Sequence, residues 1–256
     1  MEPLTYARAQ MGVSLAFHIV FAAVGVALPL LMVLADVCWL RTRDEDYLVL
    51  SKKLAKGTSI LFAVGAVSGT VLSFELGLLW PTFMGTFGEA VGLPFALEGF
   101  AFFTEAIFLG IYLYGRGRVS ERFHLFSGVA VAVSGAASAF LVTLVNAFMN
   151  DPAGLIDIAR NGRPHFDPLV AMWSPSWGVQ TMHVLLSCYE ATAWAMVGVH
   201  AFFLLRVPTR AFHRKALALA LPVACLAALV QPLSGDRSAK HVALAQPWKL
   251  AAAEAL

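Results

Sequence analysis

A small set of ionisable side chains lies within long apolar stretches of this sequence, and these residues are where its chemistry is expected. They are His18, Glu75, Glu98, Glu105, His183, Glu190 and His200. An ionisable group at the centre of a lipid bilayer costs about 3 kcal/mol or more, so such groups usually face a binding site or an ion pathway. Each member of the set is therefore a candidate functional residue.

Two of the histidines are placed where imidazole could bind a metal. His18 lies early in the first apolar stretch, and His183 begins the fifth, with Ser187 and Glu190 on the same helical face. Neutral imidazole is the commonest metal ligand in proteins and a frequent axial ligand of haem iron. For His18 the alternative is a buried histidine hydrogen-bonded to a nearby carbonyl group, and this residue alone does not decide between the two. The sequence has no C-x-x-C-H motif, so a haem would be held without covalent attachment.

Glu98 and Glu105 are spaced to form one stripe on a helix. Their separation of two helical turns places both on one face, about 10.5 Å apart along the axis. Two stacked carboxyl groups at membrane depth indicate a proton path, which Ser138 and Asn146 in the fourth stretch would extend with a hydroxyl and an amide. The alternatives are interhelical hydrogen bonds with only a packing role and, for Ser138 and Asn146, ordinary packing of small residues.

The remaining candidates lie near the ends of their stretches. Glu75 is expected near the outer end of the second stretch, where its side chain would reach water. His200 is near the opposite end of the fifth stretch and is interpreted as an interfacial residue. The 3 cysteines form no C-x-x-C motif and predict neither a disulfide framework nor a thiolate metal site.

The elements that must position these residues are membrane-spanning helices. Apolar residues make up 59% of the chain, charged residues only 13%, and the mean hydropathy is +0.74, which excludes a water-soluble globule of this size. Backbone groups cannot be left unpaired in lipid, so we predict an all-α integral membrane bundle of about six transmembrane helices. The stretches that reach the ~20 apolar residues needed to cross a bilayer are 12–36, 57–79, 94–115, 124–147, 178–205 and 216–233.

Basic residues are concentrated in alternate connections between these stretches. The connections after the first, third and fifth stretches hold most of the lysines and arginines, including Lys53, Arg118 and Arg214. Cytoplasmic loops are enriched in these residues, so we expect the N-terminus, the long loop 148–177 and the tail 234–256 outside the cytoplasm. The 18 basic and 16 acidic residues nearly cancel, which argues against a nucleic-acid partner.

The segments outside the spans differ in character. Loop 148–177 is rich in Pro, Gly and Asp and is predicted to lack regular structure, and 81–93 is predicted as a loop. We expect residues 1–233 to form the membrane bundle and residues 234–256 to begin an external loop that ends in a helix-forming string. No cleavage site follows the first stretch, so we expect it to stay in the mature chain.

Several segments together resemble subunit I of the cytochrome bd family of quinol oxidases, and the resemblance runs along essentially the whole chain. The residues around Glu75 are similar to those of the branch often called cyanide-insensitive. The matching motifs are Gln10 with His18, GTVLSFELGLLW at 69–80, LEGFAFFTEAIFLGIY at 97–112, NAFMNDP at 146–152, His183, Gly235 with Asp236, and QPWKLAAAE at 246–254.

The resemblance implies haem-binding roles for four residues. His18 would be an axial ligand of one of two high-spin haems, b-type or d-type, whose assignment to this position differs among family members. Glu98 would lie at the same dihaem site, and Arg8 would lie near the haem propionates. His183 would hold the low-spin haem b near the outer face. The membrane bundle would then contain a dihaem region in its first four spans and a low-spin haem region at the fifth.

The resemblance also implies a reaction. Glu105, Ser138 and Asn146 would match the family's route for protons from the cytoplasm, and Lys249 and Glu254 would match residues of the external loop that binds quinol. Quinol oxidation outside would release protons there, while reduction of O2 to water would consume protons drawn from inside. The implied partners are cytochrome bd subunit II, a small single-span subunit, quinol, O2 and the lipid of a bacterial cytoplasmic membrane.

The chain departs from the family in length. Subunit I of the family continues past the quinol loop through helices that carry a methionine ligand of the low-spin haem and a glutamate of the high-spin site, and neither can be located here. We therefore expect a truncated or split version of the subunit, for which ligation of all three haems is not expected. The alternatives are a non-catalytic membrane scaffold, whose buried histidines and glutamates only join helices, and a proton-coupled transporter, which would leave the histidines unexplained.

Overall fold

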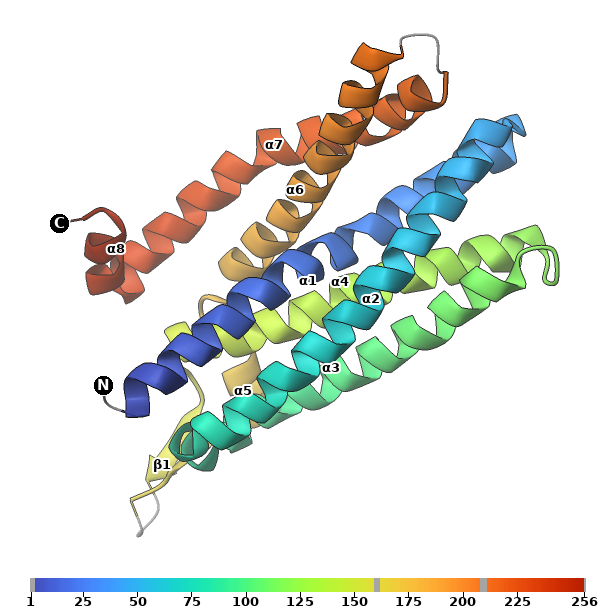
Figure 1. Cartoon of the computed structure of the whole chain (residues 1–256). Coiled ribbons are helices and arrows are strands. Elements are labelled where there is room, and N and C mark those ends of the chain that lie inside the picture. Colours follow the sequence, from blue (N-terminus) through green and yellow to red (C-terminus); the bar gives the residue numbers. More distant parts are fainter. Residues whose placement is uncertain (1–2, 159–161, 208–210, 256) are drawn as a thin grey trace.

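The computed structural model describes residues 3–158, 162–207 and 211–255, and most of them lie in long helices (Figure 1). Within this part of the chain, 6 helices are long and apolar enough to cross a membrane, which confirms the predicted bundle. They are α1 (Pro3–Thr42), α2 (Glu45–Leu79), α3 (Pro81–Gly115), α4 (Glu121–Asn150), α6 (Trp177–Arg206) and α7 (Ala211–Ala245). Each helix extends beyond the apolar stretch that predicted it, at one end or at both.

The long helices form antiparallel pairs. α1 packs on α2, α3 on α4, and α6 on α7, while α1 and α4 also contact α6 and join the pairs into one bundle. The turns after α1, α3 and α6 lie together at one end, which we call the basic end (Figure 1). The N-terminus, the turn at Trp80 and the C-terminal tail lie at the opposite end, which we call the hairpin end. This arrangement groups the connections as the distribution of basic residues predicted.

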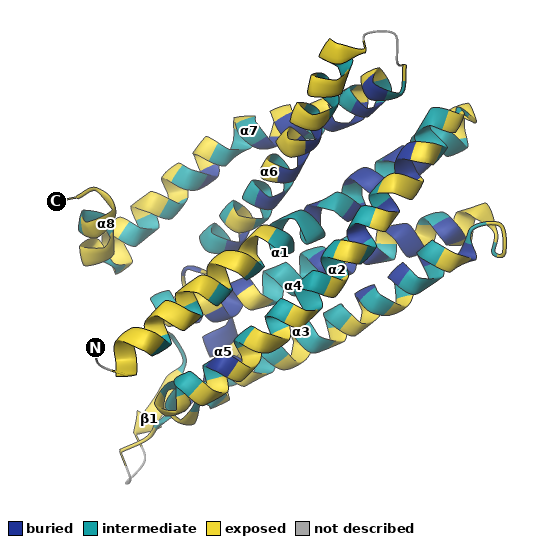
Figure 2. Ribbon diagram, in the orientation of Figure 1, coloured by how far each residue is buried: buried dark blue, intermediate teal, exposed yellow. Residues whose placement is uncertain are grey.

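Much of the outward surface of the long helices is exposed (Figure 2), and many of the exposed residues are large and apolar. Leu78 is 76% exposed and Phe100 is 72% exposed, whereas a buried cluster that includes Leu31, Leu50 and Met196 joins α1, α2 and α6. Monomeric soluble proteins rarely expose apolar surface on this scale. Lipid and partner subunits are the environments that suit such a surface.

The prediction of a loop at 81–93 is wrong, because α3 begins at Pro81 and runs through this segment. Proline suits the first position of a helix, since it lacks an N–H that would be unpaired there. Ala90 and Val91 are then fully buried against Phe148 and Phe166, and this packing offsets the hydrogen bond lost at Pro94.

The prediction that 148–177 lacks regular structure is also wrong in part. This segment contains a two-stranded antiparallel hairpin, formed by β1 (Leu155–Ile158) and β2 (Pro164–Phe166), and the short helix α5 (Pro168–Met172). Gly154 has a φ of +82°, which glycine adopts without strain, and Asp167 caps α5 by accepting from Leu169 N. The glycines and aspartates that predicted a loop instead form the turns and the cap of these elements.

The tail is more helical than predicted. α7 continues past residue 233, despite Pro232, and ends at Ala245. The short helix α8 (Pro247–Ala253) follows and confirms the helix-forming string expected at the end of the chain. The predicted boundary at residues 233 and 234 therefore falls inside a helix.

Candidate functional site

His18 lies on α1 and faces α2 at a point where the two helices approach closely. Its Nδ1 lies 2.8 Å from Ser68 Oγ, and a Cβ added to Gly69 would lie 3.3 Å from its Cε1. The Ser68 hydroxyl is also 2.8 Å from the carbonyl oxygen of Val64, to which it donates. Ser68 Oγ then accepts from the N–H of His18 Nδ1, which leaves the lone pair on Nε2 for a ligand.

Glu98 and Ser138 meet at the interface of α3 and α4. Ser138 Oγ donates to Glu98 Oε1 at 2.7 Å, and Glu98 is close enough to His18 for an electrostatic interaction. The structure therefore brings together three residues that the sequence placed in one site. Both α3 and α4 contribute to it, and α1 supplies the imidazole.

Glu105 is buried one heptad further along α3, toward the basic end. Its carboxyl group faces α4, where a Cβ added to Gly135 would lie 3.3 Å from Glu105 Oε1. Asn146, by contrast, is exposed on α4 and donates to Gln180 Oε1 on α6 at 2.7 Å. The structure thus places Glu98 and Glu105 on one face of α3, both toward α4. It does not place Asn146 beside Glu98.

The prediction that Glu75 reaches water is wrong. Its side chain is buried between α1 and α2, where Gln10 Nε2 donates to its Oε1 at 3.1 Å and Ser14 Oγ donates to the same atom at 2.7 Å. The length of α1 explains the difference, since this helix begins at Pro3 and its first turns supply the Gln10 and Ser14 side chains that contact Glu75. Glu75 Oε2 is buried without a partner among the described residues.

His183 lies on α6 and faces α7. Its Nδ1 lies 3.3 Å from Gln231 Nε2 and 3.4 Å from Ser234 Oγ, and a Cβ added to Gly235 would lie 3.5 Å from its Cε1. Contact with α7 therefore involves only one edge of the ring. Within the described part of the chain, Nε2 has no hydrogen-bond partner.

These two histidines fit a haem better than a metal ion held by side chains alone. No group of three or more His, Cys, Asp or Glu residues that could hold a metal ion occurs in the part of the chain that the structure describes. A porphyrin supplies its own equatorial nitrogens, so haem iron needs only axial ligands from the protein. His18 Nδ1–H can donate to Ser68 Oγ and His183 Nδ1–H to Ser234 Oγ, as second-shell acceptors hold metal-binding histidines. Gln231 Nε2 can only donate, and its acceptor is the backbone carbonyl of His183.

The tail is held against the end of α4 at the hairpin end. Lys249 Nζ donates to Asn150 Oδ1 at 2.6 Å, and His241 Nε2 lies 2.9 Å from Asp151 Oδ2. Glu254 is exposed just after α8, and Arg8 is exposed on the first turns of α1. The residues that the resemblance assigned to quinol binding therefore lie at the same end as the N-terminus (Figure 1).

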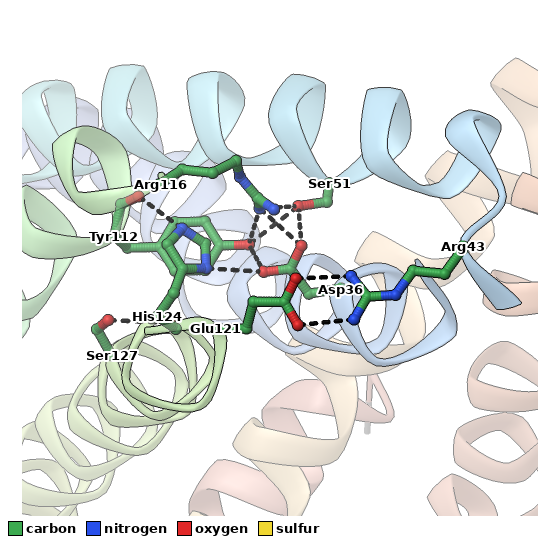
Figure 3. A network of polar contacts seen from close by, with 8 residues as sticks. All are labelled: Asp36, Arg43, Ser51, Tyr112, Arg116, Glu121, His124 and Ser127. Carbon is green, nitrogen blue, oxygen red and sulfur yellow. Dashed lines mark hydrogen bonds and ion pairs between the residues drawn. The ribbon is translucent and has the colours of Figure 1, made fainter. Parts of the chain in front are cut away.

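The sequence analysis missed a buried polar cluster at the basic end (Figure 3). Asp36 is 1% exposed, and its carboxylate accepts from Tyr112 Oη at 2.6 Å, Ser51 Oγ at 2.6 Å and Arg116 Nη2 at 2.7 Å. His124 Nδ1 lies 3.3 Å from the same carboxylate. Asp36 is the last residue of one predicted stretch and His124 is the first residue of another, so neither was counted among the ionisable residues within the spans. An acidic residue directly after a continuous apolar run was the available signal.

His200 is also better packed than an interfacial residue would be. It is half-buried on α6, and its Nδ1 lies 2.9 Å from Nδ1 of His213, a buried residue of α7. One ring must donate and the other accept, so the pair shares one proton between these atoms. The second histidine follows the connection after α6, too far along the sequence for spacing to indicate the pair.

Comparison with known proteins places these features in a family. The family described as cytochrome bd terminal oxidase subunit I matches residues 6–256. A putative cytochrome bd menaquinol oxidase subunit I of Bacillus subtilis is 38% identical over 260 residues, which cover 100% of this chain and 58% of that protein. The cytochrome bd ubiquinol oxidase subunit 1 of the same organism is 32% identical, with 100% of this chain and 55% of that protein covered.

A solved structure shows the same fold. The bd oxidase of Geobacillus thermodenitrificans superposes with a TM-score of 0.93 and 40% sequence identity, and the match covers 99% of this chain and 59% of that one. The chain thus spans a little over half the length of the relatives it matches. It belongs to the cytochrome bd terminal oxidase subunit I family.

Proposed function

We propose that this chain forms the part of a respiratory quinol oxidase subunit that binds haem through His18 and His183 and carries protons through Glu105 and Glu98. The observation that carries the proposal is the pair of imidazoles on α1 and α6, each with Nδ1 placed to donate to a hydroxyl of a neighbouring helix and Nε2 without a protein partner in the described chain. Membership of the family supports the same roles.

Bound haem b, with haem d or a further b-type haem at the oxygen site, would supply the electron transfer and the reduction of O2. The protein's own contribution is to orient the imidazoles and to move protons. Ser68 fixes the His18 tautomer by accepting from Nδ1, Ser234 would do the same for Nδ1 of His183, and Gln231 donates to the backbone carbonyl of His183. Arg8, exposed near the start of α1, is a candidate partner for haem propionates.

The carboxyl groups of α3 would deliver the protons that O2 reduction consumes. Glu105 lies deeper toward the basic end and Glu98 lies beside His18, so a proton that moves from Glu105 to Glu98 approaches the haem site. Ser138 donates to Glu98 and would be the hydroxyl of the final step. The Asn146 amide donates to Gln180 on α6, so Asn146 would not belong to the contact between Ser138 and Glu98.

Quinol would react at the hairpin end. Lys249 and Glu254 lie there on and just after α8, beside the end of α4. With the basic end in the cytoplasm and the N-terminus outside, quinol oxidation releases protons outside while oxygen reduction draws them from inside. The charge separation needs no pump. Cytochrome bd subunit II and a single-span subunit would cover exposed apolar surface in a bacterial cytoplasmic membrane.

Reduced-minus-oxidised absorption spectra of the purified complex that contains this chain test the proposal. Haem bands are expected in the wild type, and His18→Ala and His183→Ala should each remove a part of them. His165→Ala is the matched control, because His165 is exposed on β2 at the hairpin end. A colourless, well-folded protein would contradict haem binding and favour a non-catalytic scaffold.

A further inference from the structure

The Asp36 cluster at the basic end lies beside a cavity and continues the stripe of α3 that carries Glu98 and Glu105. We propose that this cluster, formed by Asp36, Ser51, Tyr112, Arg116 and His124, is the entrance through which protons reach Glu105. The inference rests on the proposed function, since it extends the route inferred there toward the cytoplasm.

The cavity gives water access to the cluster. It has a volume of about 250 Å³ and is lined by Asp36, Arg116 and His124, with Glu121 at its rim. The Glu121 side chain is 52% exposed and pairs with Arg43, which is 56% exposed, so the rim lies at the surface (Figure 3). At ~30 Å³ for each water molecule, the cavity can hold several of them beside the cluster, where the Arg116 side chain is 22% exposed.

Tyr112 links the cluster to the stripe. It follows Glu105 on α3 by the same two helical turns that separate Glu105 from Glu98, about 10.5 Å along the axis. Glycines of α4 lie opposite both residues: a Cβ on Gly128 would lie 2.8 Å from Tyr112 Cε2, and one on Gly135 would lie 3.3 Å from Glu105 Oε1. Between the two glycines α4 presents the fully buried side chain of Val131, so a polar connection between the phenol and the carboxyl group would have to run on the α2 side.

A buried hydroxyl lies at the depth of this interval. Thr58 is 1% exposed, and its Oγ1 has no hydrogen-bond partner among the described residues. Thr58 follows Ser51 on α2 by two turns, and Ser51 Oγ lies 3.0 Å from Tyr112 Oη. Because α2 is antiparallel to α3 and Phe62 stacks on Phe102, Thr58 lies at about the level of Glu105. An unpaired hydroxyl here can bond to water that lies between Tyr112 and Glu105.

The transfer involves protons alone, and no group is oxidised or reduced. A proton that arrives from the cytoplasm through the cavity water binds the Asp36 carboxylate, and the Tyr112 O–H then rotates away from it to point inward. Tyr112 gives this proton to water bonded to Thr58 while its oxygen accepts the proton of Asp36, and water passes the released proton on to the Glu105 carboxylate. The new Tyr112 O–H points at Asp36 again, so the starting arrangement is restored. Arg116 and His124 hold the Asp36 carboxyl group in place throughout.

A cluster that only ties helices together would behave differently on mutation, and two conservative variants separate the roles. Thr58→Val removes a hydroxyl that has no protein partner, and Tyr112→Phe removes one oxygen from a buried ring. Their matched controls are Thr104→Val and Tyr114→Phe, at exposed positions of the same bundle. The measurements are the haem spectrum and the rate of proton uptake in the assembled complex, with fully reduced enzyme mixed with O2.

We expect Tyr112→Phe and Thr58→Val to slow proton uptake about ten-fold or more, with haem spectra unchanged and both controls at the wild-type rate. Glu105→Gln separates the two proposals. If Glu105→Gln slows uptake while Tyr112→Phe and Thr58→Val do not, the entrance lies elsewhere and this inference is overturned. If Glu105→Gln has no effect either, the proton route of the proposed function is overturned as well.

Discussion

The basic end of the bundle and the α6–α7 interface use polar residues in different ways. Around Asp36, hydrogen bonds of 2.6 and 2.7 Å from three other side chains hold a buried carboxylate, and α1, α2 and α3 all contribute. Around His183, the contacts from Gln231 and Ser234 are 3.3 and 3.4 Å long and come from one helix. The first arrangement fixes the position of a carboxyl group from several sides, whereas the second leaves one edge of a ring available to a ligand.

The largest expected effect is at the basic end. Asp36→Ala would leave the Arg116 guanidinium and two hydroxyls without their acceptor in a buried site, which should destabilise the bundle by about 3–5 kcal/mol. Unfolding of the purified protein in detergent, followed by circular dichroism, measures the change. Glu121→Ala is the control, because its pair with Arg43 is exposed, and little change is expected. If the two variants lowered the free energy of unfolding equally, the burial of Asp36 would not explain its contribution to stability.

A smaller effect is expected where Tyr112 packs on α4. Gly128→Ala places a Cβ 2.8 Å from Tyr112 Cε2, so the ring or the helix must shift, at a cost of about 1–3 kcal/mol. Gly110→Ala on α3 is the control, since its Cβ would meet nothing within 4 Å. The same unfolding measurement applies. If Gly128→Ala is as stable as the control, the close packing described for the cluster is not present in solution.

At the α6–α7 interface, we expect a small change in the free energy of unfolding and a measurable change in the midpoint potential of a bound haem. Ser234→Ala removes one long contact to His183 Nδ1 and should cost about 1 kcal/mol or less. If His183 binds haem, the loss of a second-shell partner should still shift the midpoint potential of that haem. A redox titration of the complex measures it, with Ser187→Ala as the control because Ser187 donates to its own helix. An unchanged potential would argue against a haem on this ring.

The smallest expected effect concerns the turn between α1 and α2. Hydrogen bonds from the Lys215 ammonium lower the pKa of Asp44 below its ordinary value. The folded chain then binds a proton at Asp44 less readily than the unfolded chain does. The resulting stability is present above the ordinary pKa of Asp44 and is lost as the pH falls through the lowered one. Unfolding in acid should therefore be less pH-dependent in Lys215→Met than in the wild type, and Lys52→Met should match the wild type.

Much of the fold could be predicted from the sequence because the bilayer leaves few choices. An apolar stretch of sufficient length in lipid must be a helix, so all six spans were predictable, and the basic residues of alternate connections grouped the helix ends correctly. Helix ends outside the hydrocarbon region depend on local packing instead. For this reason the sequence did not predict that α3 would begin at Pro81 or that α7 would continue past Pro232.

The sequence by itself determined which groups are expensive in lipid, and so it identified His18, Glu98, Glu105 and His183. Only the tertiary structure decided their partners. Contacts such as His18 with Ser68 or Glu98 with Ser138 join side chains on different helices, and they depend on how the helices pack and on the side-chain rotamers. The same reason explains the error at Glu75 and the omission of Asp36. Each lies at or near the end of a predicted span, and in the folded bundle a neighbouring helix buries its carboxylate and supplies hydrogen bonds to it.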